Sequence, residues 1–168
     1  ALDNIVVDGA GSGGGGPPTC AVLPYLQDFE TGLTGMTGTT GSQSQIGIDA
    51  TSANASLLGL HFQGNLNTGW SSSYSTGALA FANSPTHIAK ASREICASTE
   101  PTLMLRFDIQ QQYTYNPSYC WFRLTVDGTP VADDQGNTYY NASGYSGFNT
   151  LRYDLSAYAN IDFTVAWE

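Results

Sequence analysis

The sequence predicts an all-β fold, an antiparallel β-sandwich of the jelly-roll type, and three observations support this prediction. Several segments of the second half alternate strictly between apolar and polar residues, which is the period of a half-buried strand. Gly-rich and Asp-Gly turns separate many short apolar segments. No segment shows a convincing helical pattern. Short strands in this number are typical of sandwiches and jelly rolls.

The first half of the folded region predicts short strands separated by polar loops. Residues 23–30 form the first predicted strand, which ends at Thr31-Gly32, and residues 31–45 are predicted as a long surface loop. Three further short strands are predicted at residues 46–48, 56–62 and 88–96. A loop over residues 71–77 leads into the apolar segment 78–82.

Alternation in the second half also predicts which side chains face the core. Asp127-Gly128 and the segment from Asp133 to Asn137 are turn signals between these strands. The residues predicted to point inward are Leu103, Leu105, Phe107 and Ile109, then Cys120, Phe122, Leu124 and Val126, then Leu151, Tyr153 and Leu155, and finally Ile161, Phe163, Val165 and Trp167.

The N-terminal segment is set apart from the rest of the chain. Residues 1–8, Ala-Leu-Asp-Asn-Ile-Val-Val-Asp, read as a detached strand; residues 9–19 are a Gly/Pro linker, and residues 20–168 are the sandwich domain. A lone strand is not stable in water, so this one either docks or is disordered. The docking residues are predicted to be Leu2, Asp3, Ile5, Val6 and Val7.

Composition excludes several function classes. The formal net charge is −9 with only five Lys and Arg residues, which argues against nucleic acid and anionic membranes as partners. No apolar run is long enough for membrane insertion. The polar residues are mainly Ser, Thr, Asn and Gln, as in secreted β proteins. Of the three cysteines, Cys20, Cys96 and Cys120, two can form a disulfide, and the sequence leaves the pairing open.

Short motifs along residues 23–168 resemble the MAM-like and cleaved-adhesin jelly-roll modules of large secreted surface proteins, particularly those of the Bacteroidota. The resemblance implies an extracellular, cell-surface module with an adhesive role. The segments that carry it are Leu23-Pro24-Tyr25, Asp28-Phe29-Glu30-x-Gly32, Gly69-Trp70, Ser75-Thr76-Gly77-Ala78-Leu79, Arg123-Leu124-Thr125-Val126-Asp127-Gly128 and Arg152-Tyr153-Asp154-Leu155-Ser156-x-Tyr158.

Modules of this kind usually close with a strand of the type apolar-Asp-Asn/Asp-apolar-x-Val, and its look-alike here is residues 2–7. Three accounts stay open: residues 1–8 belong to a preceding repeat, they fold back in cis, or they complete a neighbouring subunit or an adjacent module of the same protein. The third is donor-strand complementation, which would propagate head to tail as a filament. Burying Leu2, Ile5, Val6 and Val7 contributes about 6–12 kcal/mol gross, against about 4–15 kcal/mol for association.

Two groups of side chains are candidates for ligand binding. The resemblance implies a structural calcium held by Glu30 and Asp3, and Asp28 shares a strand face with Glu30; the alternative is a pair of solvated carboxylates. The second group would suit a carbohydrate-binding module of a larger secreted enzyme or adhesin, with an aromatic platform beside polar groups for a polysaccharide, or else form a salt-bridge ladder. It comprises Trp121, Arg106, Arg123, Arg152, Asp108 and Asp154.

Catalysis is not predicted. Neither His61 nor His87 lies in a metal-binding or paired spacing, and there is no Gly-x-Ser-x-Gly elbow or phosphate-binding loop. The predicted function is therefore that of a non-catalytic extracellular module that self-assembles, with carbohydrate binding as the alternative.

Overall fold

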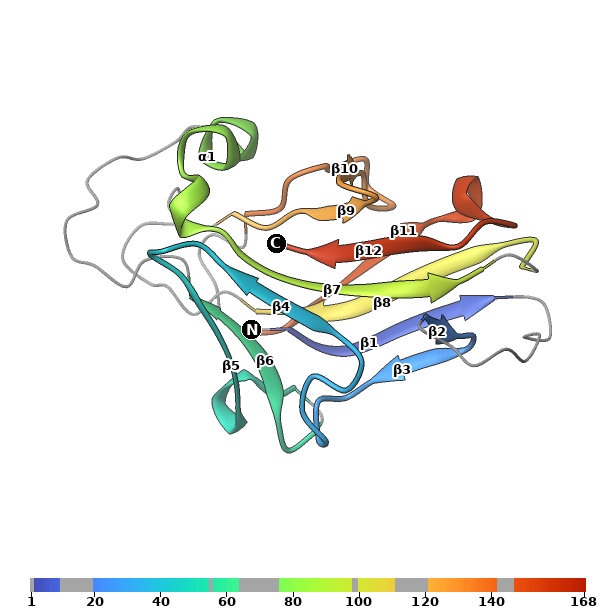
Figure 1. Ribbon diagram of the computed structural model, residues 1–168, viewed down its shortest axis with the longest axis horizontal. Helices are drawn as coiled ribbons and strands as arrows, with labels where there is room; N and C mark the ends of the chain where they lie inside the picture. Colours follow the sequence, from blue (N-terminus) through green and yellow to red (C-terminus); the bar gives the residue numbers. More distant parts are fainter. Residues whose placement is uncertain are drawn as a thin grey trace.

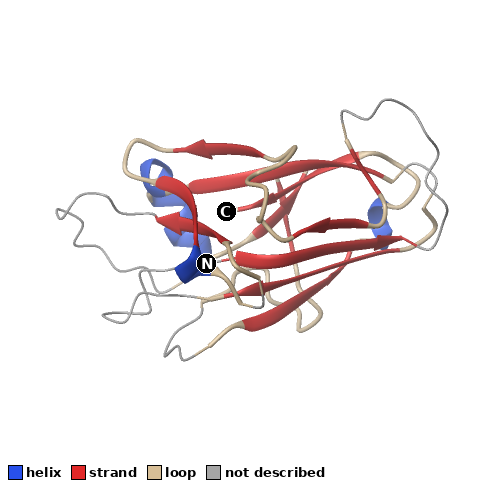
Figure 2. Ribbon diagram, turned by 90° about the horizontal axis from the view of Figure 1, so that it is seen from below, coloured by secondary structure: helices blue, strands red, loops and turns tan. Residues whose placement is uncertain are grey.

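In the computed structural model, two sheets of six strands each pack face to face as a β-sandwich (Figures 1 and 2). The structure describes residues 2–9, 20–54, 56–63, 76–97, 100–110, 121–141 and 147–168. The predicted all-β sandwich is confirmed, whereas the jelly-roll connectivity stays a prediction. No helix in the described ranges is long and apolar enough to cross a membrane.

The first sheet, called sheet A here, contains the N-terminal strand at its centre. Its strands follow the order β11 (Asn149–Asp154), β8 (Leu103–Ile109), β1 (Leu2–Gly9), β6 (Gly59–Gln63) and β5 (Gln45–Asp49), and β3 (Tyr25–Gln27) also pairs with β1. All these pairs are antiparallel. Sheet A therefore combines segments from the whole length of the sequence.

The second sheet, sheet B, contains the C-terminal strand. Its order is β10 (Thr129–Val131), β9 (Leu124–Val126), β12 (Phe163–Trp167), β7 (Ala89–Cys96) and β2 (Ala21–Val22), and β4 (Thr37–Thr40) pairs with β7. The helical elements are α1 (Gly77–Asn83) and the 3-10 turns η1 (Ala50–Ser52), η2 (Pro85–His87) and η4 (Ser156–Tyr158). Only the β2–β7 pair is parallel among the described strands.

The core lies between the sheets and is built from the predicted alternation. On β8, the side chains of Leu103, Leu105 and Phe107 are fully buried, and Met104 and Arg106 are exposed. Phe107 packs at the centre of an aromatic cluster, with ring centroids 5.4 Å from Phe122, 5.7 Å from Tyr153 and 6.3 Å from Trp167. The inward prediction is confirmed for these strands. It is wrong for Ile161, which is 51% exposed because β12 begins only at Phe163.

Three local predictions in the first half are wrong. Residues 77–83 form a helix, because Ala-rich sequence favours it and the Thr76 hydroxyl caps it by accepting a hydrogen bond from the Leu79 N–H. The predicted loop 31–45 contains strand β4, whose four residues are all exposed and give no apolar signal. Of the single strand predicted over residues 23–30, only β3 (Tyr25–Gln27) is a strand, and a cis Leu23–Pro24 bond precedes it.

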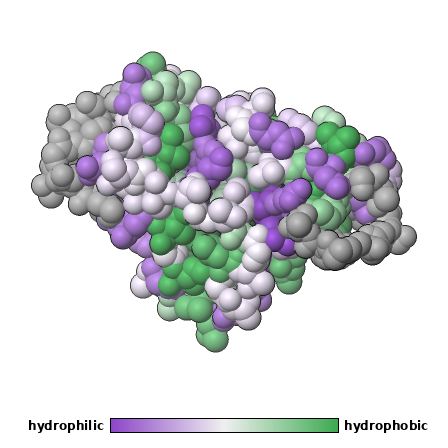
Figure 3. All heavy atoms as spheres, viewed as in Figure 1, coloured by the Kyte–Doolittle hydropathy of each residue, from purple (hydrophilic) through white to green (hydrophobic). Residues whose placement is uncertain are grey.

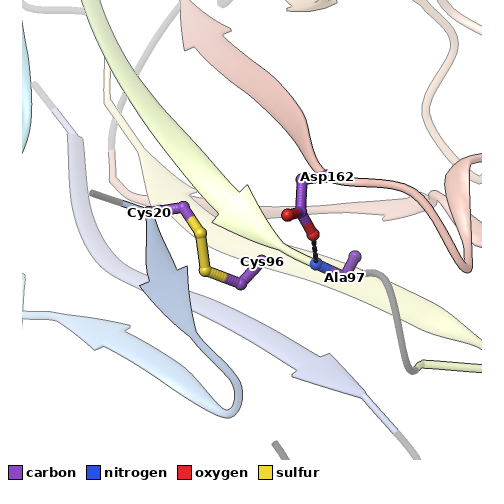
Figure 4. Close-up of a disulfide and its surroundings, with 4 residues drawn as sticks. All are labelled: Cys20, Cys96, Ala97 and Asp162. Carbon is purple, nitrogen blue, oxygen red and sulfur yellow. Dashed lines mark hydrogen bonds between the residues drawn. A yellow bond between two sulfur atoms is a disulfide. The ribbon is translucent and has the colours of Figure 1, made fainter. Parts of the chain in front are cut away.

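A disulfide joins Cys20 to Cys96, with Cα atoms 5.3 Å apart (Figure 4). It settles the pairing that the sequence leaves open; Cys120 lies outside the described residues. Next to it, a carboxylate oxygen of Asp162 accepts a hydrogen bond of 2.9 Å from the Ala97 N–H. The chain that enters the domain at Cys20 is thus covalently fixed to the end of β7.

Candidate functional site

Strand β1 occupies a position in the sheet of its own chain between β8 on one side and β3 and β6 on the other, and this position is called the slot. One edge of β1 pairs with β8 from Leu2↔Ile109 to Gly9↔Leu103, and the other edge pairs with β3 and, at Leu2, with β6. The strand that is detached in sequence is therefore central in space, in the cis arrangement. The linker was predicted over residues 9–19, but Gly9 is the last residue of β1; residues 10–19 lie outside the described residues.

A β-bulge explains how the sequence of β1 fits the slot. The register with β8 shifts from Asp3↔Asp108 to Val6↔Arg106, so β1 carries one residue more than β8 over this stretch. Asn4 adopts a positive φ of 52°, which Asn tolerates better than most residues. As a result Leu2, Ile5 and Val7, which do not alternate in sequence, all reach the core with at most 1% exposure.

On the outer face of sheet A, the bulge buries the carboxylate of Asp3 completely. Asp3 Oδ1 accepts a hydrogen bond from the Asn4 N–H at 2.9 Å. Asp3 Oδ2 accepts three more, at 2.7 Å each from the Asn54 N–H and the Ser56 hydroxyl and at 3.3 Å from Asn4 Nδ2. These donors satisfy the buried charge, and they fasten the loop before β6 onto the start of β1.

Asp108 of β8, directly opposite Asp3, connects the same parts of the sheet. Its carboxylate accepts hydrogen bonds from Asn4 Nδ2 at 3.2 Å, Asn54 Nδ2 at 2.9 Å and the Thr150 hydroxyl at 2.6 Å. Burial acts to raise the pKa of Asp108, but these three hydrogen bonds and the nearby Arg106 outweigh it and lower the pKa below its usual value.

The lowered pKa of Asp108 predicts a loss of stability in acid. A carboxyl whose pKa is lower in the folded state stabilises the fold above its unfolded pKa of about 3.9, and the contribution disappears as the pH falls through the folded pKa. We therefore expect urea denaturation to show that Asp108→Asn loses less stability than the parent protein between pH 5 and pH 3. Equal losses in the two proteins would contradict this role of Asp108.

The residues predicted to bind calcium accept hydrogen bonds in the structure. Glu30 Oε1 accepts from the N–H groups of Leu57 and Leu58 at 2.6 and 2.8 Å, and Asp28 Oδ1 accepts from the Glu30 N–H at 3.2 Å. Calcium requires oxygen ligands, whereas these carboxylates and that of Asp3 meet N–H and O–H donors. In the described part of the chain, no group of three or more acidic, His or Cys residues is arranged to hold a metal. Calcium binding stays a prediction.

The predicted carbohydrate platform is divided between the two sheets. On the outer face of sheet A, Arg106 lies directly opposite Arg152, and Asp154 lies opposite Met104. The predicted pairing of opposite charges across these strands is therefore wrong.

Arg123 directly precedes β9 of sheet B; its Nη2 lies 2.6 Å from Glu168 Oε2 and its guanidinium lies 4.0 Å from the Phe81 ring centroid. Trp121 is half-buried two residues before Arg123. These two residues cannot share a face with Arg106 and Arg152, because β9 and β8 lie in different sheets. The set of six residues does not form one surface.

Comparisons with known proteins returned no match, whether against protein-family models, curated proteins or solved structures.

Proposed function

We propose that this chain is a non-catalytic structural and adhesive module, secreted or displayed at the cell surface, that joins copies of itself by exchanging β1. The observation that carries the proposal is the position of β1, which is central in sheet A but connected to the domain only through the Gly/Pro-rich residues 10–19. The slot offers the same partners on β8, β3 and β6 to a β1 from another copy, because exchange changes only the route of the linker. The Cys20–Cys96 disulfide suits an oxidising, extracellular setting.

The concentration of the protein determines whether β1 inserts into its own chain (cis closure) or into another copy (exchange). A short Gly-rich linker holds its own strand at an effective concentration on the order of millimolar. Cis closure therefore dominates in dilute solution. Exchange competes with it when the protein itself reaches a concentration on the order of millimolar, as on a surface or during refolding at high concentration. Once inserted, β1 is held by its ladder with β8 and by the burial of Leu2, Ile5 and Val7.

Strand exchange is tested by cutting the linker. A protease site placed in residues 10–16 of the otherwise complete chain allows β1 to be separated covalently from the folded domain. We expect the cut strand to stay bound, and a labelled peptide of residues 1–9 to replace it slowly. The matched control is the same peptide with Ile5→Asp, which would bury a charge against the core and should not bind.

Fluorescence anisotropy of the labelled peptide measures this binding, and circular dichroism shows whether the cut domain stays folded. A folded cut domain that takes up neither its own strand nor the added peptide would contradict the proposal. Equal uptake of the parent and the Ile5→Asp peptide would contradict it as well, because that result means non-specific adhesion.

A second candidate function, binding of an acidic polysaccharide, is favoured by one observation. The exposed Arg106 and Arg152 face each other on adjacent strands, and neither forms an ion pair with any described residue. Like charges directly opposite each other are unfavourable, and a carboxylate bound between them would relieve the repulsion.

This second function predicts retention on immobilised polygalacturonate but not on neutral dextran. We expect the double substitution Arg106→Ser with Arg152→Ser to remove that retention, whereas Arg93→Ser on sheet B leaves it unchanged. Affinity electrophoresis in gels that contain either polymer measures the effect. Retention that persists in the double variant excludes this face as the binding surface.

A further inference from the structure

The two ends of the linker are fixed at the same end of the sandwich. Gly9, the last residue of β1, pairs with Leu103, the first residue of β8. Cys20 is bonded to Cys96, the last residue of β7. Both anchors therefore lie where β7 passes into β8, at the right-hand side of Figure 1. This region is called the β7–β8 end.

The last residue of β1 is tightly packed at the β7–β8 end. A Cβ atom added to Gly9 would lie 2.3 Å from Glu100 Oε2, so the end of β1 lies directly against the connection between β7 and β8. An incoming β1 must also run antiparallel to β8, with its Gly9 at the acceptor's Leu103. The orientation of a donated strand is therefore fixed, and its linker always leaves the acceptor at the β7–β8 end.

The reach of the linker then limits how two copies can be arranged. Eleven residue steps separate Gly9 from Cys20, which corresponds to at most about 36–40 Å of fully extended chain. The linker leaves the acceptor at its β7–β8 end and enters the donor at the donor's β7–β8 end. The β7–β8 ends of the two copies must therefore face each other.

We propose that exchange of β1 produces a closed two-fold pair joined at the β7–β8 ends, rather than an open filament. This inference rests on the proposed strand exchange. In a pair related by a two-fold axis between the β7–β8 ends, both linkers cross the same interface and each β1 fills the slot of the other copy. An open row would need each β7–β8 end to face two neighbours, and it would leave one slot empty at one terminus and one β1 unpaired at the other.

A second observation at the same end supports this pairing surface. The Asn160 N–H donates to the carbonyl oxygens of Ala97 and Glu100, at 3.0 and 3.2 Å, which places the turn before β12 at the β7–β8 end. The next residue, Ile161, is 51% exposed although its neighbours in the alternation are buried. Figure 3 shows hydrophobic surface in the region where β11 and β12 are joined. Facing ends of a pair would cover Ile161.

The test identifies which chain supplies β1. The protein carries the photo-crosslinking residue benzoylphenylalanine in place of Val6, which lies opposite Arg106 of β8 on the outer face of sheet A. It is refolded, with its disulfide intact, at about millimolar and at micromolar concentration, irradiated, and separated on denaturing gels. Light scattering gives the mass before denaturation. The matched control carries the photo-crosslinker in place of the exposed Thr40 of β4, which pairs with Ala89 at the start of β7 and so lies away from the β7–β8 end.

The expected result at high concentration is a species of about twice 17.8 kDa that crosslinks between chains from position 6 but not from position 40. The substitution Ile161→Ser should reduce the fraction of this pair several-fold without changing the crosslinking to β8 in the monomer. A ladder of larger species that crosslink between chains would retain strand exchange but overturn the closed pair. Crosslinks within the chain alone, at both concentrations, would overturn strand exchange and the pair together.

Discussion

A chain that lacks residues 1–9 is expected to be unfolded already at 25 °C and therefore to show no cooperative unfolding transition on heating. Leu2, Ile5 and Val7 are at most 1% exposed, and their burial contributes about 4.5–9 kcal/mol gross. The whole free energy of unfolding of a domain is about 5–15 kcal/mol. Deletion also opens the backbone edge of β8 and removes the Asp3 carboxylate from the Asn54 N–H and the Ser56 hydroxyl.

Thermal melting followed by circular dichroism measures this effect, and two controls separate it from general damage. The substitution Val6→Ser changes the outer face of β1 and should shift stability by much less than the deletion. Since the start of β1 and the end of β12 lie close together in both views (Figures 1 and 2), a chain that begins at Cys20 and carries residues 2–9 behind Glu168 on a short Gly/Ser linker should melt like the parent. A deletion variant that melts at the parent's temperature would show that β1 adds little to the fold.

Removal of the disulfide is expected to produce the second largest loss of stability. Cys20 and Cys96 are 76 residues apart in sequence, and closing a loop of this length stabilises the folded state by about 4.5 kcal/mol in the chain-entropy model. Native disulfides of small domains typically contribute about 2–5 kcal/mol. We therefore expect the double substitution Cys20→Ser with Cys96→Ser to lower the free energy of unfolding by an amount in this range.

Guanidinium denaturation of the double variant measures the loss, with Cys120→Ser as the matched control because that change leaves the bridge in place. The parent protein in a reductant that opens the bridge should fall to the level of the double variant. An unchanged denaturation midpoint in the double variant would contradict the predicted contribution.

The strands that could be predicted from the sequence are those with one buried and one exposed face. Alternation located β8 and β11, because Phe107 and Tyr153 pack inward while Arg106 and Arg152 face solvent. The exposed strand β4 gave no such signal, since all four of its residues lie outside the core. Helix α1 was not predicted, because its apolar residues were considered without Thr76, whose side chain caps the start of the helix.

The site was harder to predict, because it depends on register and on sheet membership. Asp3 and Asp108 are over a hundred residues apart in sequence, and only the bulge at Asn4 places them opposite each other on the outer face. The grouping of Arg123 with Arg106 assumed that their strands were neighbours, whereas they belong to different sheets. The face on which a residue of one strand lies could therefore be predicted from the sequence, whereas the strands that lie side by side could not.

The central place of β1 also has a consequence for protein synthesis. The ribosome makes β1 before β8, the partner that covers its full length, which begins about 100 residues later. At about 5–20 residues per second this corresponds to a delay of roughly 5–20 s. Throughout that time Leu2, Ile5 and Val7 have no complete sheet to enter, so β1 precedes the other described strands in the sequence and is still among the last to be buried.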